Sequence, residues 1–235
     1  GQLEIITSPY THPILPLLAD TNVAKVAVPD IILPEHRFRW QEDIPPHLEK
    51  AKAIYQSQFD RLPQGLWPSE QAISPQVLSD IAAAGFKWFC SDEAILGWTL
   101  NHFFHRNEGG TLYAPELLYQ PYRLPTPHGD LNVVFRDHRL SDLIGFTYSK
   151  LSAKTAAKDF IGRLDAIAQR LGTPIEYPWL VTIALDGENC WEEYLQDGKP
   201  FLETLYQSLS DHPGIELVTV SEFLEKYPPT ATLPS

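Results

Sequence analysis

Apolar residues gather in short runs that alternate with longer stretches of helical spacing along this chain. Six runs have the length and the β-branched or aromatic content of strands. They are residues 3–7, 65–67, 86–90, 131–135, 179–185 and 215–218. Strands that alternate with helices are typical of α/β folds with parallel strands, and the chain is therefore predicted to belong to this class.

Two of the intervening segments carry clear helix boundaries. Ser74 precedes Pro75, which suits the first position of a helix, and Gly85 is a natural stop. Ser152 is predicted to cap a second helix, and Gly172 stands just past its last apolar residue. Further helices are predicted over residues 48–59, over 201–209 and from Ser221, which would cap the last one. Residues 20–46 and 100–129 have no sustained period and are predicted to be loops.

Length and composition predict one globular domain over residues 1–228, followed by a flexible Pro- and Thr-rich tail at residues 229–235. No apolar run is long enough to cross a bilayer, so no membrane partner is predicted. The net charge of −12 argues against a nucleic-acid partner, because phosphate binding needs clustered Lys and Arg. Neutral substrates such as sugars remain compatible with it. Cys90 and Cys190 form no disulfide framework or metal-ligand spacing, which favours reduced thiols in a cytoplasmic protein.

The run at residues 179–185 has the composition of a strand buried on both faces, and it stops abruptly on Asp186. Gly187 then permits a sharp turn. In α/β folds this end of a strand carries ligand-binding and catalytic side chains. The alternative is that acids here begin a helix, where the helix dipole favours them. We prefer that alternative for Glu192 and Glu193 and the catalytic interpretation for Asp186.

Acids also follow other predicted strands. Glu70 lies after the run at residues 65–67, and Asp137 lies after the run at residues 131–135. Their recurrence at strand ends indicates a functional rim. A pair of carboxylates from different strands, set among Trp and Tyr, suits glycoside cleavage, in which one acts as nucleophile or base and the other donates a proton.

Four motifs then make the sequence recognisable. They are Ser-Pro-Tyr-Thr-His-Pro-Ile-Leu-Pro-Leu-Leu at residues 8–18, Gly-Leu-Trp-Pro-Ser-Glu at 65–70, Phe-Arg-Asp-His-Arg-Leu-Ser-Asp-Leu-Ile-Gly-Phe at 135–146, and Leu-Asp-Gly-Glu-Asn-Cys-Trp-Glu-Glu-Tyr at 185–194. With these motifs in this order, the chain resembles glycoside hydrolase family 57, in particular its amylopullulanase-like and α-amylase-like branch.

The resemblance implies an incomplete (β/α)₇ barrel with parallel strands and a retaining mechanism on α-glucans of the starch, glycogen, maltodextrin or pullulan type, without metal or cofactor. Glu70 matches the family's nucleophile and Asp186 its acid/base, with Asp137 as a rival for the second role. Retention requires the two carboxyl groups to lie roughly 5–5.5 Å apart. The predicted substrate-binding residues are Tyr10, His12, Trp67, Arg136, Asp137, Glu188 and Trp191.

One departure from the family pattern is that its first barrel strand carries a His-Gln-Pro motif, which this sequence lacks. We therefore expect a fragment without that strand, in which residues 3–7 have an unpaired edge. Two alternatives stay open. One is a metal-dependent polysaccharide deacetylase that uses His12, Asp137 and His138. The other is a non-catalytic carbohydrate-binding or regulatory relic of the fold.

Overall fold

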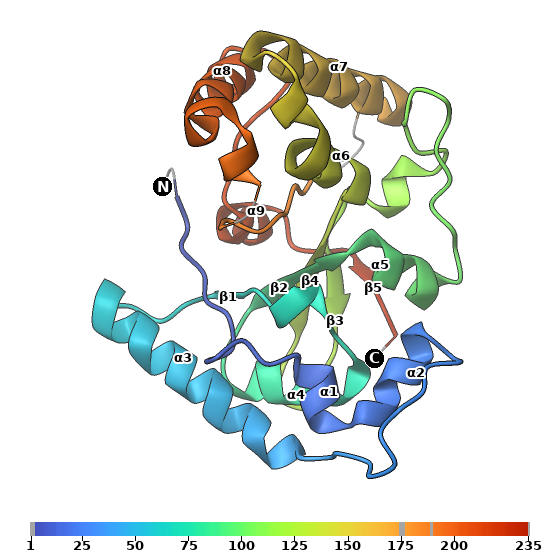
Figure 1. Cartoon of the computed structure of the whole chain (residues 1–235), viewed down its shortest axis with the longest axis vertical. Coiled ribbons are helices and arrows are strands. Elements are labelled where there is room, and N and C mark those ends of the chain that lie inside the picture. The colour runs from blue at the N-terminus through green and yellow to red at the C-terminus, as the bar shows by residue number, and fades with distance from the viewer. Residues whose placement is uncertain (1–2, 174–176, 189, 235) are drawn as a thin grey trace. The chain divides into compact units, whose positions relative to one another are not determined.

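The computed structural model describes residues 3–173, 177–188 and 190–234, and the chain divides into two compact units (Figure 1). Unit 1 consists of Gly1–Ser91, Pro121–Val134 and Val220–Ser235. Unit 2 consists of Asp92–Gln120 and Phe135–Thr219. The span predicted as one domain, residues 1–228, thus covers two units, each built from segments that are not contiguous in the sequence.

The described residues form an open sheet with the strand order β1-β2-β4-β3-β5. Its strands are β1 Gly65–Leu66, β2 Trp88–Asp92, β3 Tyr122–Leu124, β4 Leu131–Arg136 and β5 Ala231–Thr232. β1 pairs parallel with β2, and β3 pairs parallel with β5, whereas β3 and β4 are antiparallel. The α/β class and the incomplete sheet are confirmed, and the antiparallel β3 is the exception to the predicted parallel arrangement.

Unit 1 contains helices from both its N-terminal and its C-terminal segments. They are α1 Leu15–Ala19, α2 Ala24–Ala27, α3 Ile44–Phe59, α4 Pro75–Ala83 and α9 Val220–Lys226. α1, α3 and α4 are mutually in contact. The boundaries of α4 follow the predicted signals, because it begins at Pro75 and Gly85 beyond it has a φ of +89°. Ser221, by contrast, lies inside α9 and does not cap it.

Unit 2 contains α5 Glu93–Leu100, α6 His138–Asp142, α7 Ala153–Leu171 and α8 Lys199–Ser210. α7 and α8 lie side by side (Figure 1). The Thr155 N–H donates to the Ser152 hydroxyl over 3.2 Å, and Gly172 follows the last turn of α7 with a φ of +69°. Both predicted ends of this helix are therefore confirmed. None of the helices in the described parts of the chain is long and apolar enough to cross a membrane.

Short 3₁₀ turns and one π-helical turn connect these elements. They are η1 Thr21–Val23, η2 Gln41–Asp43, η3 Ser69–Gln71, η4 Pro115–Leu117, η5 (π) Leu143–Thr147, η6 Tyr148–Lys150, η7 Trp191–Glu193 and η8 Leu195–Gly198.

The strand predicted at residues 3–7 is reduced to a single parallel bridge between Thr7 and Leu66. The rest of the segment is held by side chains, since the Tyr55 hydroxyl donates to the carbonyl of Ile5 over 2.7 Å. Leu3 is 84% exposed. An apolar alternating run forms a strand only where a neighbouring strand is available along its whole length, and here the partner, β1, has just two residues.

Two other strand predictions are wrong. Residues 179–185 make one bridge, between Thr182 and Arg136, and most of their side chains are only half-buried. Residues 215–218 form no strand, and Leu217 and Val218 are exposed. β-branched composition describes what fits a half-buried pleated surface, so it does not by itself supply a pairing partner.

The C-terminal tail, for which flexibility was predicted, contains a short strand in its middle part. Ala231–Thr232 forms β5 against β3, and Leu233 is buried with its N–H donating to the carbonyl of Arg123 over 2.9 Å. β3 itself lies in the segment predicted to be a loop. Each of these strands is too short to show a period, and each is stabilised by the other.

Candidate active site

Glu70 leaves the sheet on an unusual backbone. β1 ends at Leu66, and the η3 turn then places Glu70 and Gln71 at φ values of +58° and +55°. Such angles are costly for residues other than glycine and are retained mainly where the surrounding structure enforces them. The result is that Ser69 and Gln71 are buried while the Glu70 side chain is 66% exposed.

The two residues next to Glu70 add a second energetic cost. Among the described residues, the Ser69 hydroxyl and the Oε1 atom of Gln71 are buried without a hydrogen-bond partner. Buried polar atoms normally find partners, and leaving one unpaired disfavours folding by about 1–3 kcal/mol. Strain on both sides of one exposed carboxylate is typical of a functional site rather than of a random surface turn.

His12 belongs to a second loop of unit 1 with the same kind of backbone. Thr11 and His12 have φ values of +60° and +59°, in a turn closed by the His12 N–H donating to the carbonyl of Pro9 over 2.9 Å. The turn places His12 Nε2 3.5 Å from Oε1 of Glu70. The structure therefore brings together two of the residues that the sequence predicted for the site.

Two aromatic residues predicted to stack on sugars also lie in unit 1. Trp67 is half-buried, and its N–H donates to the carbonyl of Thr7 over 2.8 Å. Tyr10 is half-buried as well, and Lys50 Nζ lies 3.9 Å from the centre of its ring. Lys50 thus covers one face of Tyr10, whereas Trp67 carries no such cation among the described contacts.

Asp137 occupies a buried position in unit 2, directly after the last residue of β4. Its side chain is 2% exposed and accepts three hydrogen bonds. The donors are the Tyr119 hydroxyl at 2.6 Å, the Leu140 N–H at 2.8 Å and the Arg106 guanidinium at 3.1 Å. A carboxylate that caps α6 and is held this firmly suits a structural role better than proton exchange with a substrate.

Arg106 connects Asp137 with a second buried acid. Two of its nitrogens donate to the two oxygens of Glu93, each over 2.6 Å, and the N–H of His138 donates to the same carboxylate over 3.0 Å. Although burial lowers the pKa of Arg106, its bond to Glu93 and the charge of Asp137 hold that pKa above its ordinary value. Burial and the charge of Asp137 likewise raise the pKa of the Tyr119 hydroxyl.

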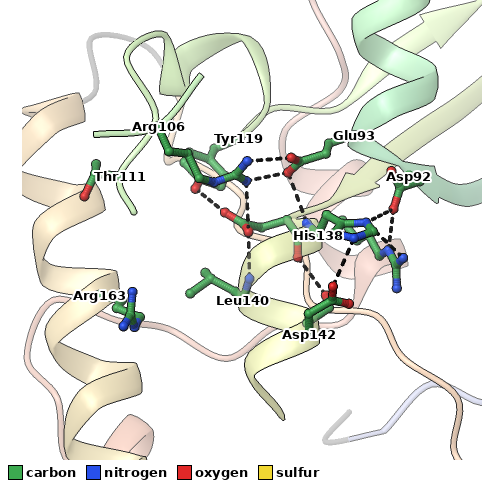
Figure 2. Close-up of polar contacts among 12 residues, drawn as sticks. Asp92, Glu93, Arg106, Thr111, Tyr119, His138, Leu140, Asp142 and Arg163 are labelled. Carbon is green, nitrogen blue, oxygen red and sulfur yellow. Dashed lines mark hydrogen bonds and ion pairs between the residues drawn. The ribbon is translucent and has the colours of Figure 1, made fainter. Parts of the chain in front are cut away.

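A further cluster lies beside these residues and is centred on Asp92. Arg136 Nε lies 2.6 Å from Asp92 Oδ2, and His138 Nδ1 lies 2.9 Å from the same oxygen. Figure 2 shows His138 between Asp92 and Asp142, whose Oδ2 is 3.0 Å from Nε2. Burial raises the pKa of Asp92, but hydrogen bonds from the Ala94 N–H, His138 and Arg136 together hold it below its ordinary value.

Asp186 and Glu188 follow residues 179–185, and both are exposed. Trp191 is half-buried, and its ring nitrogen donates to the carbonyl of Gly187 over 3.0 Å. Gly198 leaves room for the Trp191 ring, since a Cβ there would lie 2.5 Å from it. This packing inside unit 2 limits the ring surface that Trp191 can offer to a sugar.

Sequence reasoning missed Arg106 and Tyr119. Both lie in a segment predicted to be a loop, although they supply the side chains that hold Asp137. The signal that the sequence offered was weak: a basic residue in an aromatic-rich stretch of a chain in which several predicted strands are followed by acids. Of the three residues in the deacetylase alternative, Asp137 and His138 are engaged as described, and no group of three His, Cys, Asp or Glu in the described residues is arranged to hold a metal.

Comparison with known proteins identifies the family. The family model described as Glycosyl hydrolase family 57 matches residues 1–234. The chain belongs to glycosyl hydrolase family 57. No curated protein matches its sequence. Glu70 and Asp186 lie in different units of this family member, and their pairing stays a prediction.

Several solved structures share the fold at low identity. The 4-alpha-glucanotransferase from Thermococcus litoralis is 21% identical with a TM-score of 0.67, and the match covers 100% of this chain and 30% of that enzyme. The alpha-amylase AmyC from Thermotoga maritima is 17% identical with a TM-score of 0.68, and the match covers 99% of this chain and 50% of that enzyme. The GH57-type branching enzyme from Pyrococcus horikoshii is 18% identical with a TM-score of 0.68, and the match covers 100% of this chain and 47% of that enzyme. The chain thus spans half or less of the length of these enzymes.

Proposed function

We propose that this chain carries the catalytic residues of a retaining α-glucan hydrolase or transglycosidase. Family membership supports a glycoside-cleaving reaction, and the related structures are named as a glucanotransferase, an amylase and a branching enzyme. The observation that carries the assignment is Glu70, an exposed carboxylate on a strained backbone with His12 beside its oxygen.

In the proposed reaction Glu70 attacks the anomeric carbon of the sugar, and the glycosidic oxygen leaves as Asp186 donates a proton to it. Asp186, now ionised, then takes a proton from water or from a sugar hydroxyl, which displaces Glu70 from the glycosyl-enzyme. Two inversions give net retention. Hydrolysis and transfer to a second sugar share the first step and differ only in the acceptor.

Substrate recognition is proposed to involve Trp67, His12 and one face of Tyr10 in unit 1, and Glu188 and Trp191 in unit 2. Arg136 and Asp137, also predicted to contact sugars, make the intramolecular bonds described above. We therefore propose that these two residues support the site and do not grip the substrate.

The decisive experiment combines product stereochemistry with a nucleophile variant. The protein should release the α-anomer first from an α-maltooligosaccharide, as followed by proton NMR, and Glu70→Ala should lose turnover. Added azide should restore cleavage of an activated substrate by Glu70→Ala and give the β-glycosyl azide, because only one displacement then occurs. First release of the β-anomer would contradict retention.

The matched control is Glu49→Gln, because Glu49 is a carboxylate of unit 1 that pairs only with nearby Lys52 in the described contacts. It should keep full turnover. Binding of a maltooligosaccharide by calorimetry without any turnover in the native protein would instead favour the non-catalytic carbohydrate-binding alternative.

A further inference from the structure

The segment that leads to Asp186 has little backbone pairing of its own. Among the described residues its backbone-to-backbone contacts with other segments are the bridge between Thr182 and Arg136, with the Asp137 N–H donating to the carbonyl of Thr182 over 2.9 Å, and the Leu180 N–H, which donates to the carbonyl of Tyr119 over 2.9 Å. A single bridge fixes the chain far less firmly than a ladder. The position of Ala184, two residues before Asp186, must therefore be set by other groups.

Ser141 supplies one of these groups. Its side chain is buried on α6, and the N–H of Ala184 donates to its hydroxyl oxygen over 3.2 Å. The same hydroxyl donates to the carbonyl of Asp137 over 2.8 Å. The hydroxyl thus accepts from one segment and donates to the other, which an apolar side chain of the same size cannot do.

Arg136 supplies the second group, which binds the carbonyl of Ala184 rather than its N–H. Its Nη1 donates to the carbonyl of Ala184 over 3.1 Å. Its Nε donates to Asp92, whose carboxylate also accepts from the N–H of Ala94 over 2.9 Å. Both backbone groups of Ala184 are therefore held by side chains that are themselves fixed, and Ala184 is buried between them.

We propose that Ser141 and Arg136 are positioning residues for Asp186. By binding the N–H and the carbonyl of Ala184, they fix the backbone two residues before Asp186 and so determine where its carboxyl group lies. This inference rests on the proposed role of Asp186 as the acid/base. A displacement of about 1 Å at a catalytic group is enough to cost on the order of 100-fold in rate.

The test separates a misplaced acid from a general loss of folded protein. An acid is needed when the leaving group is a sugar hydroxyl, and it is not needed when the leaving group is 2,4-dinitrophenolate. Ser141→Ala should lower kcat/KM on an α-maltooligosaccharide on the order of 100-fold and lower kcat/KM for the dinitrophenyl glycoside by less than about threefold, because kcat/KM reports the first step, in which Asp186 acts as the acid. Equal losses on both substrates, or no loss, would overturn the proposal.

Two variants make the result specific. Ser208→Ala is the matched control, because the Ser208 hydroxyl bonds only within α8 of the same unit among the described contacts, and it should leave both rates unchanged. Arg136→Gln provides a second way to release Ala184 and should show the same selectivity for the leaving group as Ser141→Ala. An Arg136→Gln variant that loses both rates alike would count against the proposal.

Asp186→Asn distinguishes this inference from the proposed function. If Asp186→Asn shows the leaving-group selectivity and Ser141→Ala does not, the positioning role is wrong and the acid/base assignment stands. If Asp186→Asn shows no selectivity, the assignment of Asp186 falls and the positioning role falls with it. Amide hydrogen exchange at Ala184 gives a readout without turnover, and it should quicken in Ser141→Ala and not in Ser208→Ala.

Discussion

His12 Nε2 lies 3.5 Å from Oε1 of Glu70, and each residue stands on a backbone with a φ near +60°. Two separate loops of unit 1 thus adopt an unfavourable conformation, and both use it to present the side chains that meet. Neither side chain is buried enough for packing to explain the arrangement, since they are 49% and 66% exposed. We infer that the strain is maintained for the chemistry of the Glu70 carboxylate.

Replacing His12 should therefore affect activity more than stability. His12→Asn is the appropriate change, because Asn tolerates a positive φ and so preserves the turn. We expect kcat/KM on an α-maltooligosaccharide to fall about tenfold, which corresponds to about 1.4 kcal/mol of transition-state stabilisation. Thermal unfolding should shift by less than about 2 °C, because an exposed side chain contributes little to stability.

The control is His36→Asn, at an exposed histidine of the same unit. It should change neither kcat/KM nor the unfolding temperature. If His12→Asn keeps full activity, the contact with Glu70 has no part in the reaction, and the shared strain of the two loops needs another explanation.

Arg106 is predicted to be important for the stability of unit 2. Arg106→Met removes the cation that Glu93 and Asp137 share and leaves both carboxylates buried without it. Breaking a buried ion pair by deleting one partner costs about 3–5 kcal/mol. Chemical denaturation followed by circular dichroism should show a loss of this size in the free energy of unfolding.

Lys199→Met gives the comparison for an exposed pair. Lys199 pairs with Glu203 on α8, where the two side chains are 74% and 68% exposed and solvent screens the interaction, so the expected loss is about 1 kcal/mol or less. Similar losses in the two variants would mean that the network around Arg106 is no stronger than a surface ion pair.

The sequence was sufficient where an element carries its own boundaries. The helix between Ser152 and Gly172 has a capping hydroxyl at one end and a glycine at the other, and both behave as predicted. The central strands were also found, because their runs are apolar enough to be buried. Strands that depend on a distant partner were predicted poorly. Residues 215–218 were predicted to be a strand and form none, whereas β3 and β5 were not predicted and pair with each other.

The site was harder to predict because an acid at the end of a strand can serve either as a catalytic group or as the cap of the next helix. Asp137 follows β4, as predicted for a catalytic rim, yet it caps the helix that follows it, and Asp92 at the end of β2 does the same. The sequence around them contains the same strand, acid and helix start in either case. What decides between the uses is whether partners such as Arg106 and Tyr119 reach the carboxylate, and those partners come from a loop without a period.

Asp92 should make the stability of the protein depend on pH in a defined direction. Its pKa is lower in the folded state than its ordinary value, so the folded protein favours the ionised form. The resulting stabilisation is present above the unfolded pKa, near 4, and is lost as the pH falls through the lower folded pKa. Asp92→Asn keeps the helix cap but removes the charge.

We therefore expect Asp92→Asn to lower the free energy of unfolding by about 1.5–3 kcal/mol at pH 7. The difference from the native protein should shrink progressively below about pH 4. Asp211→Asn, at an exposed position of the same unit, should show no such dependence. Denaturant titrations at several pH values provide the measurement, and a difference that stays constant with pH would contradict the role of the Asp92 charge.

Gly198 is a position at which a single added methyl group should be disruptive. It has a φ of +80°, and an added Cβ would lie 2.5 Å from the Trp191 ring. Gly198→Ala should therefore lower the free energy of unfolding by roughly 1–3 kcal/mol. Gly162→Ala is the matched control, because Gly162 lies within α7 with open space around it, and it should stabilise the protein by about 0.5–1 kcal/mol.

A double-mutant cycle separates the two causes of the Gly198 effect. Trp191→Phe shortens the ring system and relieves the steric contact, but it leaves the unfavourable backbone angle unchanged. If the contact contributes, Gly198→Ala should cost less in the Trp191→Phe background than in the native protein, by at least about 0.5 kcal/mol. Additive effects would assign the whole loss to the backbone and would leave Trp191 freer to face a sugar than its packing against Gly198 indicates.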